Sequence, residues 1–301
     1  MRLLVTGSSG TIGSALVKAA TERGDDVIRL VRGAPKRENG EAGWNPTSGQ
    51  VDAQALDGAD ALVHLAGESI AEGRWTAAKK RRILSSRVEG TRTLVNAMRG
   101  LVAPPKVFLC ASAIGYYGDR GDEVLDEQSP PGAGFLPEVC KAWETEAERA
   151  VECGVRVIRI RIGVVLDRGS GMLARILPVF RKGLGGTLGG GVQFVSWIDL
   201  GDLVRAMLYC LNSDGLEGPV NAVAPKPVTN AELTKELAEA LGRHALLPAP
   251  AFMLRLALGE MTDELLLSSL RVEPRKLLNS GFRFDYADIQ TALRKELDGA
   301  S

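Results

Sequence analysis

Three glycines stand three residues apart near the start of the chain, between a short apolar run and a helical pattern. This residue type at this spacing can hold a phosphate group, because a phosphate needs bare backbone amides at a helix N-terminus and a side chain would block its approach. The order of strand, glycine triplet and helix predicts dinucleotide binding, with a purely structural turn as the alternative. The predicted contacts are Gly7, Ser8, Ser9, Gly10, Thr11, Ile12 and Gly13.

Arg32 follows the next apolar run, 27–31, at the place where an NAD-binding site would put an acidic residue on the ribose hydroxyls. A carboxylate would repel a 2′-phosphate, whereas a guanidinium can hold it with paired, charge-assisted hydrogen bonds. Arg32 therefore favours NADP over NAD as the cofactor. The alternative is an ordinary exposed charge at a strand end.

Elements that could position these residues alternate through the first half of the chain. Apolar runs rich in β-branched residues and leucine predict strands, longer helical patterns predict helices, and their alternation predicts an α/β fold with a Rossmann-type, doubly wound parallel sheet. The expected strands cover 3–6, 27–31, 61–65, 107–111 and 155–165, and the expected helices cover 12–23, 76–98 and 138–152.

The pattern changes after about residue 166 and becomes mainly helical. It predicts an NADP-binding domain over 1–166 and a smaller, mainly helical substrate lobe over 167–301, with a short strand near 220–223 that could return to the main sheet. Within the lobe we expect helices at 172–182, 200–211 with Asp199 as N-cap, 231–241, 252–258, 264–270 and 287–297, a glycine-rich loop at 183–191 and a strand at 192–198.

The charges of the 301-residue chain balance, with 37 Lys plus Arg against 37 Asp plus Glu, which disfavours nucleic acid and anionic membranes as partners. The chain begins without the apolar core of a signal peptide, and its longest apolar stretch is too short for a membrane span. The spacing of the four cysteines suits neither a metal site nor a redox pair. We expect a cytoplasmic protein with a small-molecule substrate and no metal, and a homodimer is compatible with the sequence.

Several further motifs resemble one protein family. The glycine spacing after a threonine is similar to that of the short-chain dehydrogenase/reductases, and 63–67, 88–91, 111–118 and 126–131 resemble their extended, epimerase-like branch. The segments Glu68, 183–186, 196–198 and 259–261 resemble the subgroup labelled epimerase family protein or nucleoside-diphosphate-sugar epimerase.

This resemblance covers nearly the whole chain and implies an extended Rossmann domain with NADP as cofactor. It implies that Leu65, Ala66 and Gly67 run beside the adenosine and pyrophosphate. The activity it implies is that of an NADP-dependent oxidoreductase or epimerase-like enzyme acting on a small carbonyl or sugar-like substrate. A non-catalytic NADP-binding regulator or scaffold is the alternative.

The catalytic residues of the superfamily are a serine, a tyrosine and a lysine four residues after that tyrosine. Ser112 fits the serine, where it would orient the substrate oxygen, and Lys141 fits the lysine, where it would bind the ribose. The residue four before Lys141 is Pro137, so the usual general acid/base is missing. We therefore take Ser112, Tyr117 and Lys141 as the catalytic candidates.

Four groups could supply the missing proton: Tyr116 or Tyr117 at the strand end, Glu138, or a water held by Ser112. A tyrosine would need a nearby cation to lower its pKa, and Lys141 is the available one. In the alternative, the protein binds NADP without turning it over.

Glu68, Tyr116 and Trp197 are the expected substrate contacts, with core packing as an equal alternative for Trp197. Arg87 could reach a phosphate or substrate, or brace a neighbouring loop. His64 lies in an apolar run and is expected to be a buried, hydrogen-bonded residue. The loop 183–191 could be a mobile flap or a plain hairpin turn.

Overall fold

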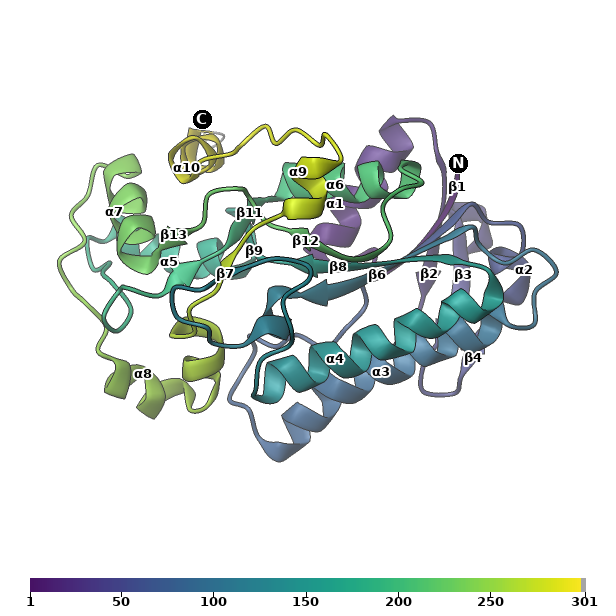
Figure 1. Ribbon diagram of the computed structural model, residues 1–301, viewed down its shortest axis with the longest axis horizontal. Helices are drawn as coiled ribbons and strands as arrows, with labels where there is room; N and C mark the ends of the chain where they lie inside the picture. The colour runs from purple at the N-terminus through teal and green to yellow at the C-terminus, as the bar shows by residue number, and fades with distance from the viewer. Residues whose placement is uncertain (299–301) are drawn as a thin grey trace.

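An eight-stranded sheet organises the computed structural model, which describes residues 1–298 (Figure 1). All pairs in it are parallel except the last, between β3 and β4, and β1 lies between β2 and β5, where the strand order reverses. In such sheets ligands bind above the carboxyl ends of the strands at the reversal point. The strands in spatial order are β12 (Gly218–Ala222), β8 (Arg156–Ile162), β6 (Val107–Ala113), β5 (Ala61–His64), β1 (Arg2–Thr6), β2 (Asp26–Val31), β3 (Glu41–Asn45) and β4 (Gln50–Val51).

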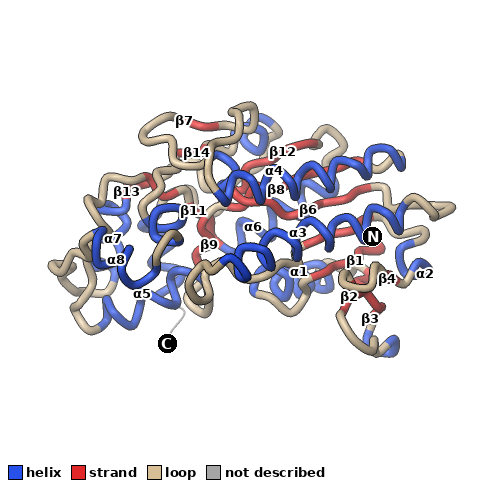
Figure 2. The backbone as a smooth tube through the Cα atoms, turned by 90° about the horizontal axis from the view of Figure 1, so that it is seen from below, coloured by secondary structure: helices blue, strands red, loops and turns tan. Residues whose placement is uncertain are grey.

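Helices cover both faces of this sheet, as expected for buried parallel strands. One face packs against α1 (Thr11–Glu22) and α6 (Leu200–Asn212), and the other packs against α2 (Ala53–Leu56), α3 (Ala77–Met98) and α4 (Phe135–Glu148). Figure 2 shows α3 and α4 side by side over the strands. The predicted α/β fold is confirmed.

The main sheet and the helices that cover it form the first unit of the structure. The remaining elements form a second unit, which packs around Trp197 and is mainly helical. Two short ladders join it to the first unit, β9 (Val164–Leu166) with β11 (Trp197–Asp199), and β7 (Val124–Leu125) with β14 (Arg271–Val272). Its other elements are α5 (Gly171–Arg181), β10 (Phe194–Val195), β13 (Val228–Thr229), α7 (Asn230–Ala240), α8 (Ala251–Leu258), α9 (Arg275–Asn279) and α10 (Ile289–Asp298).

The predicted division at residue 166 is too simple. β12 pairs with β8 in the main sheet, as the short strand near 220–223 suggested, and α6 packs on α1, so residues 200–222 belong to the first unit. Asp199 caps α6 as predicted, accepting hydrogen bonds from the amides of Gly201 and Asp202.

The single strand predicted over 155–165 is divided at Gly163. A Cβ atom there would lie 2.7 Å from the carbonyl oxygen of Ser196, so only glycine lets the chain leave β8 and pair with β11. The strand predicted over 192–198 is likewise two short strands, and the helix predicted over 264–270 is replaced by a single π-helical turn, Thr262–Leu266.

The glycine-rich loop 183–191 is paired with another segment and is not a plain hairpin turn. It lies along the segment 247–249, where the amide of Ala249 donates to Thr187 and the amide of Leu247 donates to Gly185. A Cβ atom on Gly186 would lie 2.0 Å from the carbonyl oxygen of Leu247, so the two segments are in close contact. Within residues 1–298, no helix is both long enough and apolar enough to cross a bilayer.

Candidate functional site

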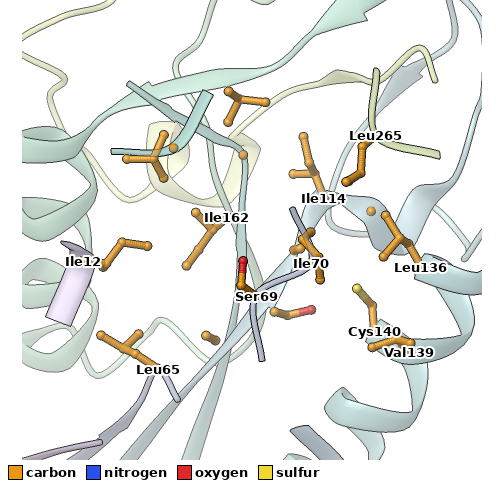
Figure 3. A pocket seen from close by; sticks show the side chains of 18 of the residues that line it. Ile12, Leu65, Ser69, Ile70, Ile114, Leu136, Val139, Cys140, Ile162 and Leu265 are labelled. Carbon is orange, nitrogen blue, oxygen red and sulfur yellow. The ribbon is translucent and has the colours of Figure 1, made fainter. Parts of the chain in front are cut away.

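A cavity of about 610 Å³ opens above the carboxyl ends of β1, β5, β6 and β8, between the two units. Figure 3 shows that its walls are mostly aliphatic side chains from both units. Arg87 and Glu264 are its charged residues, and Ser69, Ser112, Ser170 and Ser268 supply hydroxyl groups. The labelled apolar walls are Ile12, Leu65, Ile70, Ile114, Leu136, Val139, Ile162 and Leu265.

The glycine triplet forms the turn into α1 at one end of this cavity. Gly7 has φ +67° and approaches β5 so closely that a Cβ atom would lie 2.8 Å from the amide nitrogen of Ala66, and a Cβ atom on Gly13 would lie 2.1 Å from Gly7 O. Gly10, Thr11 and Ile12 line the cavity, and the N-cap residue Gly10 has no side chain that could cap the helix. The uncapped N-terminus of α1 therefore fits the pyrophosphate of a dinucleotide.

A second cavity of about 550 Å³ adjoins the first and shares Gly7, Gly10 and Leu65 with it. Arg32 lines this cavity with an exposed side chain, and among residues 1–298 no carboxylate forms an ion pair with it. An unpaired guanidinium beside two serine hydroxyls fits a 2′-phosphate. The cavity is also lined by the predicted contacts Ser8, Ser9, Ala66, Gly67 and Glu68. Arg29 from β2 and Trp44 from β3 line it as well, and sequence reasoning missed both.

Thr6 fixes the ends of β1 and β5 at the junction of the two cavities. Its hydroxyl oxygen accepts hydrogen bonds from the amides of Leu65 and Ala66, at 3.1 and 3.3 Å, and lies 2.7 Å from Nδ1 of His64. His64 is fully buried, and burial lowers its pKa to about 3, so the ring is neutral. The prediction of a buried, hydrogen-bonded His64 is confirmed.

Ser112 lies at the cavity wall, where the sequence placed it, but its proton points away from the cavity. Its hydroxyl donates to Glu144 Oε1 at 2.7 Å, and Arg161 binds the same carboxylate with two hydrogen bonds of 2.8 Å. All three side chains are buried. Because the only proton of Ser112 is used, the atoms it can offer to the cavity are the lone pairs of its oxygen.

Tyr116 and Tyr117 do not line the cavity, which corrects both predictions. Tyr117 is fully buried, donates to Asn221 at 2.7 Å and accepts from Arg161 at 2.9 Å. Burial raises the pKa of Tyr117 to about 12. The guanidinium of Arg161 packs on the ring of Tyr116, and Arg161 Cζ lies 3.5 Å from the centroid of that ring. Both rings are held by the core behind the cavity wall.

The structure does not place Lys141 where the sequence suggested, at the cofactor ribose. Lys141 lies on the exposed face of α4, outside the cavity. The cavity face of that helix carries Leu136 and Cys140, one turn apart, together with Val139 and Trp143 (Figure 3). A shift of one residue turns a helical side chain by about 100°, which here separates solvent from cavity. Glu138 is also exposed and outside the cavity.

Two of the predicted substrate contacts have other partners. Trp197 is fully buried in the core of the second unit, and its indole nitrogen donates to Lys226 O at 3.1 Å, so the core-packing alternative is correct. Glu68 lines the second cavity, but its carboxylate binds Lys79 at 2.8 Å, and this hydrogen bond lowers the pKa of Glu68.

Two cavity residues have roles that the sequence did not settle. Glu264, from the second unit, accepts hydrogen bonds of 2.8 Å from the amides of Phe135 and Leu136, so it caps α4. Arg87 braces the loop before α3, donating to Glu68 O at 3.0 Å, and also lines the cavity. Burial lowers the pKa of Arg87. The charge of Arg87 was visible in the sequence, whereas Glu264 acts across 128 or more residues and gives no local signal.

Comparisons with known proteins agree with this geometry. Residues 3–223 match the NAD dependent epimerase/dehydratase family, and residues 249–296 match a domain of unknown function, DUF1731. Epimerase family protein Mb2239 of Mycobacterium bovis is 43% identical over 289 residues, which are 96% of this chain and 95% of that protein. Epimerase family protein SDR39U1 of Homo sapiens is 34% identical over 298 residues, 98% and 99% of the two chains.

A crystal structure of human epimerase family protein SDR39U1 (isoform 2) with NADPH is similar along nearly its full length. Its TM-score is 0.90 at 33% identity, and the match covers 99% of each chain. The human protein was therefore crystallised with NADPH, a dinucleotide that carries a 2′-phosphate.

Proposed function

Because this chain belongs to the NAD dependent epimerase/dehydratase family, in its extended short-chain dehydrogenase/reductase branch, we propose that it binds NADP(H) and catalyses hydride transfer to or from a small organic substrate. The observation that carries the proposal is the continuity of the two cavities through Gly7, Gly10 and Leu65, from Arg32 to Ser112. NADP(H), when bound, supplies hydride chemistry at nicotinamide C4.

The cofactor seat uses three parts of the chain. The amides at the N-terminus of α1 hold the pyrophosphate, Arg32 with Ser8 and Ser9 holds the 2′-phosphate, and the aliphatic cavity receives the nicotinamide end. The amides and the two serines belong to the β1–α1 turn, Arg32 follows β2, and the aliphatic walls come from both units.

Ser112 determines which substrate oxygen can be held. Because its proton is donated to Glu144, Ser112 accepts a hydrogen bond from a substrate hydroxyl. In alcohol oxidation Ser112 would accept the proton of the substrate hydroxyl while passing its own proton to Glu144, and bound NADP⁺ would supply the hydride acceptor. The reverse steps reduce a carbonyl. This relay takes the role of the absent tyrosine. Because Ser112 can only accept a hydrogen bond, the complex with NADP⁺ should bind an alcohol more tightly than the corresponding carbonyl compound.

A non-catalytic NADP(H)-binding protein is the second candidate. The cavity face of α4 supports it, because Leu136 and Cys140 occupy the one-turn pair where a proton-transferring pair would stand. Burial raises the pKa of Cys140 to about 11, so its thiol is a poor acid/base near neutral pH.

The first experiment measures cofactor choice. NADPH and NADH are titrated by cofactor fluorescence against the wild type and Arg32→Glu. We expect NADPH to bind at least about tenfold more tightly than NADH in the wild type and to lose that preference in the variant. Equal wild-type affinities contradict the assignment of Arg32 to the 2′-phosphate.

The second experiment distinguishes an NADP(H)-dependent enzyme from a non-catalytic NADP(H)-binding protein. A panel of alcohols and carbonyl compounds is screened for NADPH production or consumption with the wild type, Ser112→Ala and the matched surface control Lys141→Ala. The relay predicts a loss of about 10²-fold or more in Ser112→Ala and unchanged turnover in Lys141→Ala. Equal turnover in all three proteins contradicts the relay, and no turnover with any compound favours the binder.

A further inference from the structure

The substrate cavity contains one cation that the protein does not neutralise. Arg87 projects from the middle of α3 into the cavity, and among residues 1–298 no carboxylate lies within ion-pair distance of it. Other basic residues on the same helix do have acidic partners: Lys80 binds Glu260 at 2.6 Å, and Arg92 binds Glu146 at 2.6 Å. Arg81, the other basic residue of α3 without an ion pair among the described residues, is exposed to solvent, whereas Arg87 is half-buried at the cavity.

The guanidinium of Arg87 is fixed in position. Both of its hydrogen bonds within the described residues leave from Nη1, to Glu68 O at 3.0 Å and Ile83 O at 3.2 Å. The cation also lies over the Trp143 ring, 5.1 Å from its centroid, and a Cβ atom on Gly67 would be 3.3 Å from Arg87 Cζ. Nη2 and Nε are left for a ligand.

A half-buried cation among aliphatic walls is costly unless an anion offsets its charge. The carboxylate of the other charged residue at this cavity, Glu264, is bound to two backbone amides of α4. The charge of Glu68 also favours the cationic form of Arg87, but this carboxylate binds Lys79 at 2.8 Å and makes no ion pair with Arg87. A ligand anion could therefore contact the guanidinium directly.

We propose that Arg87 binds the carboxylate or phosphate of the substrate, so that this cavity takes a small molecule with an anionic end and a mainly apolar body. The proposal rests on the proposed function and narrows its substrate class. Arg87 lines the Ser112 cavity and not the Arg32 cavity, which places it at the nicotinamide end of the cofactor seat. A guanidinium suits either anion because it offers paired donors in one plane.

Matched probes test the inference in the complex with NADP⁺. Hexanoate and benzoate are compared with hexanamide and benzamide by calorimetry, using the wild type, Arg87→Gln, Arg87→Lys and the exposed control Arg81→Gln from the same helix. We expect the wild type and Arg81→Gln to bind at least one carboxylate about tenfold or more tightly than its amide. Arg87→Gln should lose this preference, and Arg87→Lys should keep part of it.

Two outcomes overturn the inference. One is a wild-type complex that shows no preference for either carboxylate over its amide. The other is an Arg87→Gln protein, folded by circular dichroism, whose NADPH affinity falls about tenfold, because the guanidinium would then belong to the cofactor pyrophosphate. A wild type that fails to bind NADPH contradicts the proposed function instead, and the same probes titrated into the cofactor-free protein then decide the inference alone.

Discussion

Leu136 and Cys140 lie one helical turn apart on the face of α4 that borders the cavity, and Lys141 points to solvent beside them. The wall next to Ser112 is therefore apolar at both positions. Burial raises the pKa of the Cys140 thiol to about 11, so the thiolate that reacts with alkylating reagents is scarce near neutral pH.

Alkylation by iodoacetamide measures this directly. At pH 7.5 we expect Cys153, which is partly exposed, to be modified first and Cys140 to remain unmodified in the folded protein. Modification of Cys140 should begin only as the pH approaches 11. Mass spectrometry of tryptic peptides assigns each site, and rapid modification of Cys140 at pH 7.5 would contradict the buried position.

Tyr117→Phe tests whether this residue is structural. The substitution removes the hydroxyl between Asn221 and Arg161, so we expect a loss of about 1–3 kcal/mol in the free energy of unfolding, measured with urea. NADPH affinity should stay within about twofold of the wild type, because the ring lies outside the cavity. A large fall in affinity with intact stability would return Tyr117 to the site.

His64 makes stability depend on pH in acid. Its pKa is about 3 in the folded protein and 6.5 when unperturbed, so the unfolded chain binds the extra proton below pH 6.5. The stabilisation is complete above pH 6.5 and is lost as the pH falls towards 3, by about 1.4 kcal/mol per unit. Urea unfolding at pH 7 and pH 5 should therefore differ by roughly 2 kcal/mol more in the wild type than in His64→Asn. Equal pH dependence in the two proteins would disprove the assignment.

Glu264→Ala removes the cap of α4. We expect the amides of Phe135 and Leu136 to lose protection from hydrogen exchange and the stability to fall by about 1 kcal/mol. Exchange in α1, which Glu264 does not touch, is the internal control. Unchanged protection at both amides would show that another group caps the helix.

Gly13→Ala should abolish cofactor binding, because the new methyl group would lie 2.1 Å from Gly7 O and displace the turn. Gly100→Ala is the matched control, since its Cβ atom would meet nothing closer than Ala97 O at 3.9 Å. NADPH fluorescence should show a loss of more than about tenfold in the first variant and none in the second. Normal binding by Gly13→Ala would argue against the turn as the phosphate site.

The fold and the positions of the glycine turn and Arg32 at the sheet were largely predictable from sequence because they depend on local patterns. The triplet and Arg32 follow strands recognisable by their apolar runs, and their spacing alone places them at one edge of the sheet. The spacing of residues in the sequence does not show which face of α4 borders the cavity. Matching Lys141 to the lysine of the resembled superfamily placed the wrong face there.

The placement of Tyr117 in the site was wrong for a different reason, which also explains why the sequence left two alternatives open for Trp197. Tyr117 finds its partner Asn221 from a strand 104 residues away, and Trp197 finds the carbonyl of Lys226 across a loop. Burial of such residues depends on long-range packing, which neighbouring sequence does not encode. Both lie near the expected site in sequence and behind its wall in space.

The strand pair β7–β14 and the contacts of Glu127 bear on how the chain can be divided. Glu127 accepts hydrogen bonds from the amides of Asn221 and Lys276, and β7 pairs with residues 271 and 272, so the C-terminal segment completes the surroundings of the first unit. A fragment ending near residue 223, where the family match stops, would remove the Lys276 amide from Glu127, the Glu273 carbonyl from the Asn221 side chain and the partner strand of β7. We therefore expect the shortened chain, expressed alone, to aggregate, because the edge of β7 and the buried Glu127 would lose partners that the C-terminal segment supplies.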